Sequence, residues 1–188
     1  HGVLLYSALC EVVPTLRNSS EIAVHSITGR RVGDRLLILM PFSELVLRLP
    51  DVRIGDCLPL SGQVLGIGVR SIKVGIPQVR ALRESRHLHS HFVTLADISG
   101  PEQFESELCH RLRQMGVTSM VESILRPRRP LRLGNRWIMG YEVVLARLTS
   151  AESLLIQENR ITNSDRGFDH GHFGCGIFLP DNRVRKFL

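Results

Sequence analysis

The second half of the chain alternates strand-like and helix-like hydrophobic patterns, and this order limits the folds that it can adopt. The β-rich run 92–98 ends at a Ser-Gly-Pro turn, after which Phe104, Leu108 and Leu112 recur at the four-residue spacing of a helix. Residues 118–125 and 137–148 predict two strands, 151–161 a second helix, and 175–179 a last short strand. The predicted order, β-α-β-β-α-β, is the split βαβ arrangement of a ferredoxin-like domain.

The first half repeats this order with one element missing. The pattern predicts a helix over 2–13, strands at 22–27, 36–40 and 45–49, a short helix at 52–60 and a closing strand at 64–74. Since a ferredoxin-like unit begins with a strand, we expect further residues upstream of His1. We therefore expect an α+β chain of two tandem ferredoxin-like (βαββαβ) domains, residues 1–90 and 91–188, with the first strand of the N-terminal domain missing.

Arginine dominates the charged residues of the chain. The formal net charge is +6, and Lys73 and Lys186 are the only lysines among 24 basic residues. Because a guanidinium pairs two phosphate oxygens and stacks on bases, this composition favours a polyanionic partner. A GC-rich coding sequence also enriches arginine, but it does not explain the net positive charge.

No segment of the sequence predicts a membrane or a disulfide framework. The longest apolar stretch, 36–42, is far shorter than the ~20 residues that span a bilayer. The four cysteines lie far apart without a CxxC pair, which favours small buried side chains. We expect a cytoplasmic protein.

The basic residues concentrate between positions 126 and 136, in the predicted connection between two strands. This segment contains no acidic residue and five arginines: Arg126, Arg128, Arg129, Arg132 and Arg136. Two prolines stiffen it, so it can reach into an RNA groove and contact successive phosphates; a solvated basic hairpin is the alternative. The same alternatives apply to a smaller basic turn with Arg30 and Arg31, while Trp137 is predicted to be a core anchor.

A glycine-rich loop, GHFGCGIFLP, precedes the last predicted strand. Glycines allow close backbone approach to a ligand and expose N–H groups that can hold phosphate, although a tight turn uses glycine equally well. Phe173 has glycine neighbours and is a candidate for stacking on a base, and His172 is a candidate RNA contact. The predicted loop contacts are Gly171, His172, Phe173, Gly174 and Gly176.

Three histidines, His87, His89 and His91, alternate at strand spacing. Such a row resembles a metal site, but Glu84 is the only carboxylate near it and no cysteine is close. A row facing RNA or solvent is the simpler interpretation. We therefore expect no metal ion and no cofactor.

The chain resembles the CRISPR-associated repeat-processing endoribonucleases of the RAMP superfamily, and most closely their Myxan-type subgroup. The resemblance covers essentially the whole chain and depends on HGVLLYSAL at the start, IAVHSITGR, VGIPQVRAL and HFVTL along it, and GHFGCGIFLP at the end. It implies tandem ferredoxin-like domains and metal-independent cleavage of precursor CRISPR RNA beside a repeat hairpin. It also implies that the product stays within a type I interference complex with other subunits.

The implied reaction needs a group that removes a proton from the ribose 2′-OH, and imidazole titrates in the right range. His25 and His1 are the catalytic candidates, with His25 slightly favoured because related enzymes draw their histidine from this region. Arg17 stands where some relatives carry another histidine. A non-catalytic RNA-binding subunit of the same superfamily remains the alternative function.

Overall fold

The structure is a computed structural model of the 188-residue chain. It describes all residues except 1, 18, 20, 33–35, 96, 97, 99, 128, 134, 135, 162–173 and 182–188, and it leaves out the side chains of 31, 129, 132, 133 and 136. The chain divides into two compact units. The first unit runs to Val79 and includes Gly174, whereas the second begins at Arg80 and resumes at Cys175.

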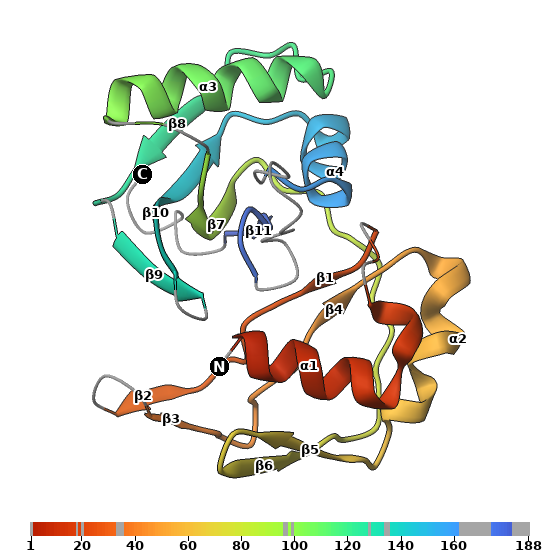
Figure 1. Cartoon of the computed structure of the whole chain (residues 1–188). Coiled ribbons are helices and arrows are strands. Elements are labelled where there is room, and N and C mark those ends of the chain that lie inside the picture. Colours follow the sequence, from red (N-terminus) through yellow and green to blue (C-terminus); the bar gives the residue numbers. More distant parts are fainter. Residues whose placement is uncertain are drawn as a thin grey trace. The chain divides into compact units, whose positions relative to one another are not determined.

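Helix α1 (Gly2–Val12) provides the centre of the first unit (Figure 1). Its residues Leu5 and Leu9, one helical turn apart, are both fully buried. They pack in one cluster with Leu16, Ile22 and Leu65, which come from the segments after the helix. Burying each such side chain contributes about 2 kcal/mol, so this cluster fixes α1 in the first unit.

The strands of the first unit form three short antiparallel pairs. They are β1 (Ala23–Val24) with β4 (Leu47–Arg48), β2 (Arg30–Val32) with β3 (Leu36–Ile38), and β5 (Val64–Ile67) with β6 (Arg70–Lys73). A 3-10 turn (Asp51–Arg53), helix α2 (Ile54–Cys57) and a second 3-10 turn (Leu58–Leu60) separate β4 from β5. The predicted short helix at 52–60 is therefore split into three short turns.

The predicted closing strand at 64–74 is wrong in one respect, because the segment folds back on itself as the β5–β6 hairpin. Gly68 occupies the turn with a φ of +64°, a conformation that glycine adopts without strain. The alternation of apolar residues continues across the turn, and this continuity made one long strand look plausible. Glycine inside such a run was the available signal for the turn.

The second unit contains an antiparallel sheet with the strand order β11-β7-β10-β8. The strands are β7 (Leu88–Val93), β8 (Glu122–Leu125), β10 (Arg136–Ala146) and β11 (Leu179–Pro180). Tyr141, Val143 and Leu145 alternate along β10 and face the core, as a strand with one covered face requires. With α3 (Pro101–Gln114), β9 (Arg129–Leu133) and α4 (Ser150–Glu158) included, the chain order in this unit is β7-α3-β8-β9-β10-α4-β11, which has one strand more than the predicted β-α-β-β-α-β.

Two helices lie on one face of this sheet (Figure 1). Helix α3 (Pro101–Gln114) starts at a proline in its first turn and buries Phe104, Leu108 and Leu112, as predicted. Helix α4 (Ser150–Glu158) starts with a capping box in which Thr149 and Glu152 exchange hydrogen bonds. Both helices therefore begin where the sequence places their starting signals.

The architecture is mixed α and β with small antiparallel sheets, in agreement with the predicted class. Three segments of the second unit differ from the prediction. Strand β7 begins at Leu88, within the histidine row, and β11 is confined to Leu179 and Pro180 because residues 174–176 form turns. The predicted basic connection contains a further strand, β9 (Arg129–Leu133).

Candidate functional site

Strand β9 and the first half of β10 form a two-stranded ribbon that extends the sheet of the second unit (Figure 1). β10 pairs with β9 from Arg136 to Gly140, and with β8 and β7 only from Tyr141 onwards. We call residues 126–140 the basic ribbon. The described residues of the predicted connection thus include a pair of strands, whose backbone hydrogen bonds fix the spacing of the paired residues.

The base of the basic ribbon is held closely against β7 and the residue after it. The Thr94 hydroxyl donates a hydrogen bond to the Met139 carbonyl oxygen, at 3.0 Å. A Cβ atom at Gly140 would lie 2.5 Å from the Val93 carbonyl oxygen and 2.6 Å from the Phe92 ring. Only glycine fits at this position, so the ribbon leaves the sheet at a defined point.

The five arginines predicted between positions 126 and 136 belong to the basic ribbon, whereas Arg30 and Arg31 lie on β2. The Arg126 side chain is 53% exposed, and its Nε lies 3.6 Å from an oxygen of Glu142. Arg129, Arg132 and Arg136 occupy strand positions, and their side chains are outside the described part of the structure, as is all of Arg128. The described backbone thus places Arg129 and Arg132 on β9 and Arg136 on β10, with Arg126 before β9.

A buried histidine and carboxylate pair lies on β7 and β10, on the sheet face away from α3 and α4. His89 Nε2 lies 2.8 Å from Glu142 Oε1, with exposed fractions of 6% and 12%. The rings of His89 and His91 meet edge to face with centroids 4.5 Å apart, and His91 is exposed. Sequence reasoning missed Glu142, since it joins His89 only through strand pairing.

The histidine row is therefore not one uniform surface. His89 is buried and paired, whereas His87 is half-buried and His91 exposed. A register shift in the β7–β10 pairing interrupts the strict alternation that the sequence suggested. Over the described ranges, no three His, Cys, Asp or Glu side chains form a group that could hold a metal ion.

The two described glycines of the glycine-rich loop have different surroundings. Gly174, with φ +82°, lies in the first unit, where an added Cβ would be 3.2 Å from the Ser26 hydroxyl. Gly176, with φ +65°, donates its N–H to the Phe92 carbonyl oxygen at 2.7 Å. The Gly176 N–H thus donates to another backbone group of the protein, whereas the Gly174 backbone lies close to Ser26, in the segment after β1. Gly171, His172 and Phe173 lie outside the described residues.

Of the two catalytic candidates, the structure describes one. His25 follows β1 directly, is 8% exposed, and donates its backbone N–H to the Val46 carbonyl oxygen. The next residue, Ser26, is the one that Gly174 approaches, so two predicted site regions meet in the first unit. His1 lies outside the described residues, and Arg30 is exposed on β2 beside Arg31.

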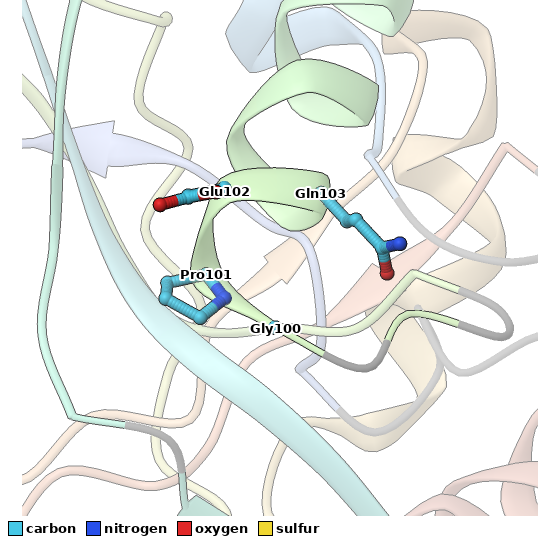
Figure 2. A pocket seen from close by; sticks show the side chains of 4 residues that line it. All are labelled: Gly100, Pro101, Glu102 and Gln103. Carbon is cyan, nitrogen blue, oxygen red and sulfur yellow. The ribbon is translucent and has the colours of Figure 1, made fainter.

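Two shallow hollows lie in the second unit, and neither is lined by a predicted catalytic or RNA-binding residue. The first has a volume of about 360 Å³ and is lined by Gly100 and by the first three residues of α3, Pro101, Glu102 and Gln103 (Figure 2). Its only charged group is a carboxylate, which does not suit an RNA phosphate. The second hollow, about 780 Å³, lies between residues 84–87 and 147–150.

Comparison with known proteins decides the family. The Cas6 CRISPR family model matches residues 1–183 of this chain. The chain belongs to the Cas6 family. The resemblance to CRISPR-associated endoribonucleases, inferred from the sequence, is therefore confirmed.

A curated Cas6 relative matches this chain from end to end. It is the CRISPR-associated endonuclease Cas6 of Myxococcus xanthus (strain DK1622), 28% identical over 186 residues, which are 99% of this chain and 77% of the relative. Among solved structures, the CRISPR endoribonuclease Cse3 bound to a 19-nucleotide RNA has a TM-score of 0.44 and 11% identity, covering 92% of this chain and 84% of that one. Cas6e of Escherichia coli K-12 has a TM-score of 0.36 and 12% identity, covering 94% and 91%.

Two further observations concern this Cas6 chain. In the part of the chain that the structure describes, no helix has the length and hydropathy needed to cross a membrane. Trp137, predicted to anchor a core, is instead 66% exposed on the basic ribbon. The sequence indicated that Trp137 directly follows the arginines of the connection. Its place on a paired strand could not be predicted, because it depends on the pairing of β10 with β9.

Proposed function

We propose that this chain binds the hairpin of a CRISPR repeat and cleaves precursor CRISPR RNA at one phosphodiester, without a metal ion. The observation that carries the proposal is the Cas6 family match over residues 1–183. The basic ribbon supports it physically, because cations at strand spacing on a rigid element suit the phosphates of a folded RNA. Recognition then depends mainly on the shape and charge of the stem.

We also infer that both units are ferredoxin-like domains, residues 1–90 and 91–188. The strand order β11-β7-β10-β8 with two helices on one face supports this fold for the second domain. In the first domain, α1, the pairs β1–β4 and β5–β6, and the turns between them follow a similar chain order. The compact units change over between Val79 and Arg80, close to the proposed boundary.

The proposed reaction is an internal transesterification. A base removes the proton of the 2′-OH, and the 2′-oxygen attacks the adjacent phosphorus. The bond from phosphorus to the 5′-oxygen breaks, and that oxygen receives a proton, which leaves a 2′,3′-cyclic phosphate and a 5′-OH. Arginine side chains and loop N–H groups stabilise the pentacoordinate phosphorane between these steps. The reaction needs no metal because imidazole transfers the protons.

His25 and His1 are the proposed bases. The meeting of Gly174 with Ser26, next to His25, supports a site that combines the glycine-rich loop with this histidine. The loop residues Gly171, His172, Phe173 and Gly176 and the basic turn at Arg30 and Arg31 complete the proposed RNA surface. The His25 side chain is only 8% exposed, so the site must open locally before the 2′-OH can reach its ring.

Cleavage of a labelled repeat RNA in EDTA tests the proposed function. We expect a single cut that yields a cyclic phosphate, and no cut when the nucleotide before the scissile phosphate is 2′-deoxy, because the nucleophile is then absent. Intact RNA in the first sample, or cleavage of the deoxy substrate, contradicts the mechanism. Restoration of cutting only after Mg²⁺ is added contradicts the metal independence.

Separate replacement of the two histidines assigns the base. We expect either His25→Asn or His1→Ala to slow cleavage by ~10² or more while RNA binding persists. His110→Ala serves as the matched control, because His110 is exposed on α3 and contacts Gln114. Thermal unfolding of His25→Asn distinguishes a lost base from a lost fold. Normal cleavage by both variants removes these histidines from the mechanism.

The alternative function is a non-catalytic RNA-binding subunit of a type I interference complex. The burial of His25 favours this alternative, because a buried ring does not reach RNA unless the site opens, whereas it can serve a structural role as it stands. Both functions use the basic ribbon and leave the processed RNA bound beside other subunits. Tight binding of the repeat without any cut, in the same EDTA experiment, identifies the subunit.

A further inference from the structure

Trp137 is a large aromatic side chain left open to solvent on the basic ribbon. It is 66% exposed, and it is the only tryptophan of the chain. Two residues along β10, on the same side of the strand, Met139 is 39% exposed. A folding chain gains stability by burying such side chains, so this exposure needs a reason beyond the fold of the second unit.

The charge around Trp137 narrows the kind of partner. Between Arg126 and Glu142 the sequence has no acidic residue, and the strand pairing sets Trp137 opposite Arg132, on the same face of the basic ribbon, whereas Arg136 occupies the other face. A protein partner covering this indole would have to present a carboxylate at the Arg132 position or leave a cation desolvated there. A nucleic acid meets both requirements, because it has phosphates for the cations and flat bases for the ring.

The basic ribbon is also held ready before binding. The Thr94 to Met139 hydrogen bond and the tight fit at Gly140 fix the end of the ribbon that lies two or three residues from Trp137. Pro130, opposite Met139, removes conformational freedom from the paired strand. A ring on a rigid strand loses little entropy when a base stacks on it, which favours affinity.

We propose that Trp137 stacks on an unpaired base of the bound RNA while Arg132, opposite it on β9, holds a neighbouring phosphate. The inference deepens the proposed function and rests on it: the substrate is a stem that carries at least one unpaired nucleotide within reach of the ribbon. A continuous duplex does not offer such a face, since its bases already stack on each other. The ribbon thus reads the junction between paired and unpaired RNA.

The emission of Trp137 reports on this contact directly, because no other tryptophan contributes. Repeat RNA with a 2′-deoxy nucleotide before the scissile phosphate remains intact during the titration. We expect saturating repeat RNA to quench the emission, and a blunt duplex of the same stem to bind without quenching. Abasic substitution of each unpaired nucleotide in turn should abolish the quenching at one position.

Affinity measurements give the second arm of the test. Stacking contributes about 1–3 kcal/mol per base, so Trp137→Ala should weaken binding about 5- to 150-fold, and Trp137→Phe much less. The slope of log K against log salt should stay unchanged, because no phosphate contact is lost. Met120→Ala, which removes a 91% exposed side chain elsewhere in the second unit, should bind like the unsubstituted protein.

The outcomes separate this inference from the proposed function. If repeat RNA binds and is cleaved without quenching, or if Trp137→Ala binds it with unchanged affinity, the stacking role is wrong and the nuclease stands. If the unsubstituted protein does not bind repeat RNA, both proposals fail together.

Discussion

Glu152 shows how much one buried carboxylate can organise. Its oxygens accept hydrogen bonds from the backbone N–H groups of Thr118, Ser119 and Thr149, and from the hydroxyls of Ser119 and Thr149. These bonds, with the Ser119 hydroxyl first among them, lower the pKa of Glu152 to about 2. The side chain therefore joins the start of α4 to the segment before β8 in its ionised form.

The first prediction concerns acid stability. Because the pKa of Glu152 is depressed in the folded state, its contribution is fully present above its ordinary pKa of 4.5 and is lost as the pH falls toward 2. We expect Glu152→Gln to cost about 2 kcal/mol at pH 7, since hydrogen bonds to a charged group are replaced by weaker ones. The difference should shrink between pH 4.5 and 2 in chemical unfolding experiments. A constant difference across this range would contradict the assignment.

His89 marks the limit of residue-level prediction. The sequence placed His87, His89 and His91 on one strand, and the structure places His89 and His91 in β7 with His87 just before it. What the sequence did not contain is the partner: Glu142 is 53 positions away and reaches His89 through the β7–β10 pairing. Local spacing predicts which side chains share a strand, but burial and ion pairing depend on the neighbouring strand.

At the scale of elements, helices were predicted better than strands. The helices α1, α3 and α4 have apolar residues at helical spacing, and α3 and α4 also have local starting signals, so each could be located from its own sequence. The pairs β2–β3 and β5–β6 are short, and their bounds depend on hydrogen bonds to another strand and, for β5–β6, on the turn at Gly68. β9 was missed as a strand because arginine and proline are poor strand signals.

The second prediction belongs to the basic ribbon as an element. Each lost phosphate contact should reduce the steepness of log K against log salt by about 0.7 to 0.9, according to counterion release. We therefore expect Arg128→Ala and Arg129→Ala each to weaken repeat binding and flatten this slope by roughly one unit. Filter binding at several salt concentrations measures both effects.

Arg113→Ala is the matched control for this prediction. Arg113 is exposed on α3 and lies in the same unit, so its removal changes the net charge equally without touching the ribbon. Equal slopes for Arg113→Ala and the ribbon variants would mean that overall charge governs binding. An unaltered slope in Arg128→Ala and Arg129→Ala would remove the ribbon from the RNA interface.

At the scale of the whole molecule, the mixed α and β class and the Cas6 family were both accessible from the sequence. Except for β9, the order of elements in the second half follows from patterning, and the family follows from segments spread over the chain, ending in GHFGCGIFLP. The division of the chain was less accessible, since Gly174 belongs with the first unit although it lies near the C-terminus. No local sequence pattern predicts that a segment near the C-terminus packs with the first unit.

The net charge of +6 leads to the third prediction, which concerns the stability of the whole chain. Like charges repel in the folded protein, and RNA that binds only this state both neutralises them and stabilises it by mass action. At about 100 times the dissociation constant, intact 2′-deoxy repeat RNA should add ~2.7 kcal/mol, which corresponds to a Tm increase of about 5–10 °C.

Salt and RNA structure determine whether this stabilisation has the proposed origin. If phosphate contacts dominate, the Tm increase should fall steeply as salt rises at fixed RNA concentration, because the dissociation constant rises with each contact. A single-stranded RNA of the same composition provides the matched control, since it has the same charge without a stem, and it should raise the Tm less. An equal increase from both RNAs means that charge alone is recognised. An increase that persists undiminished at high salt means that contacts other than phosphate pairing hold the RNA, and the arginines of the basic ribbon then lose their assigned role.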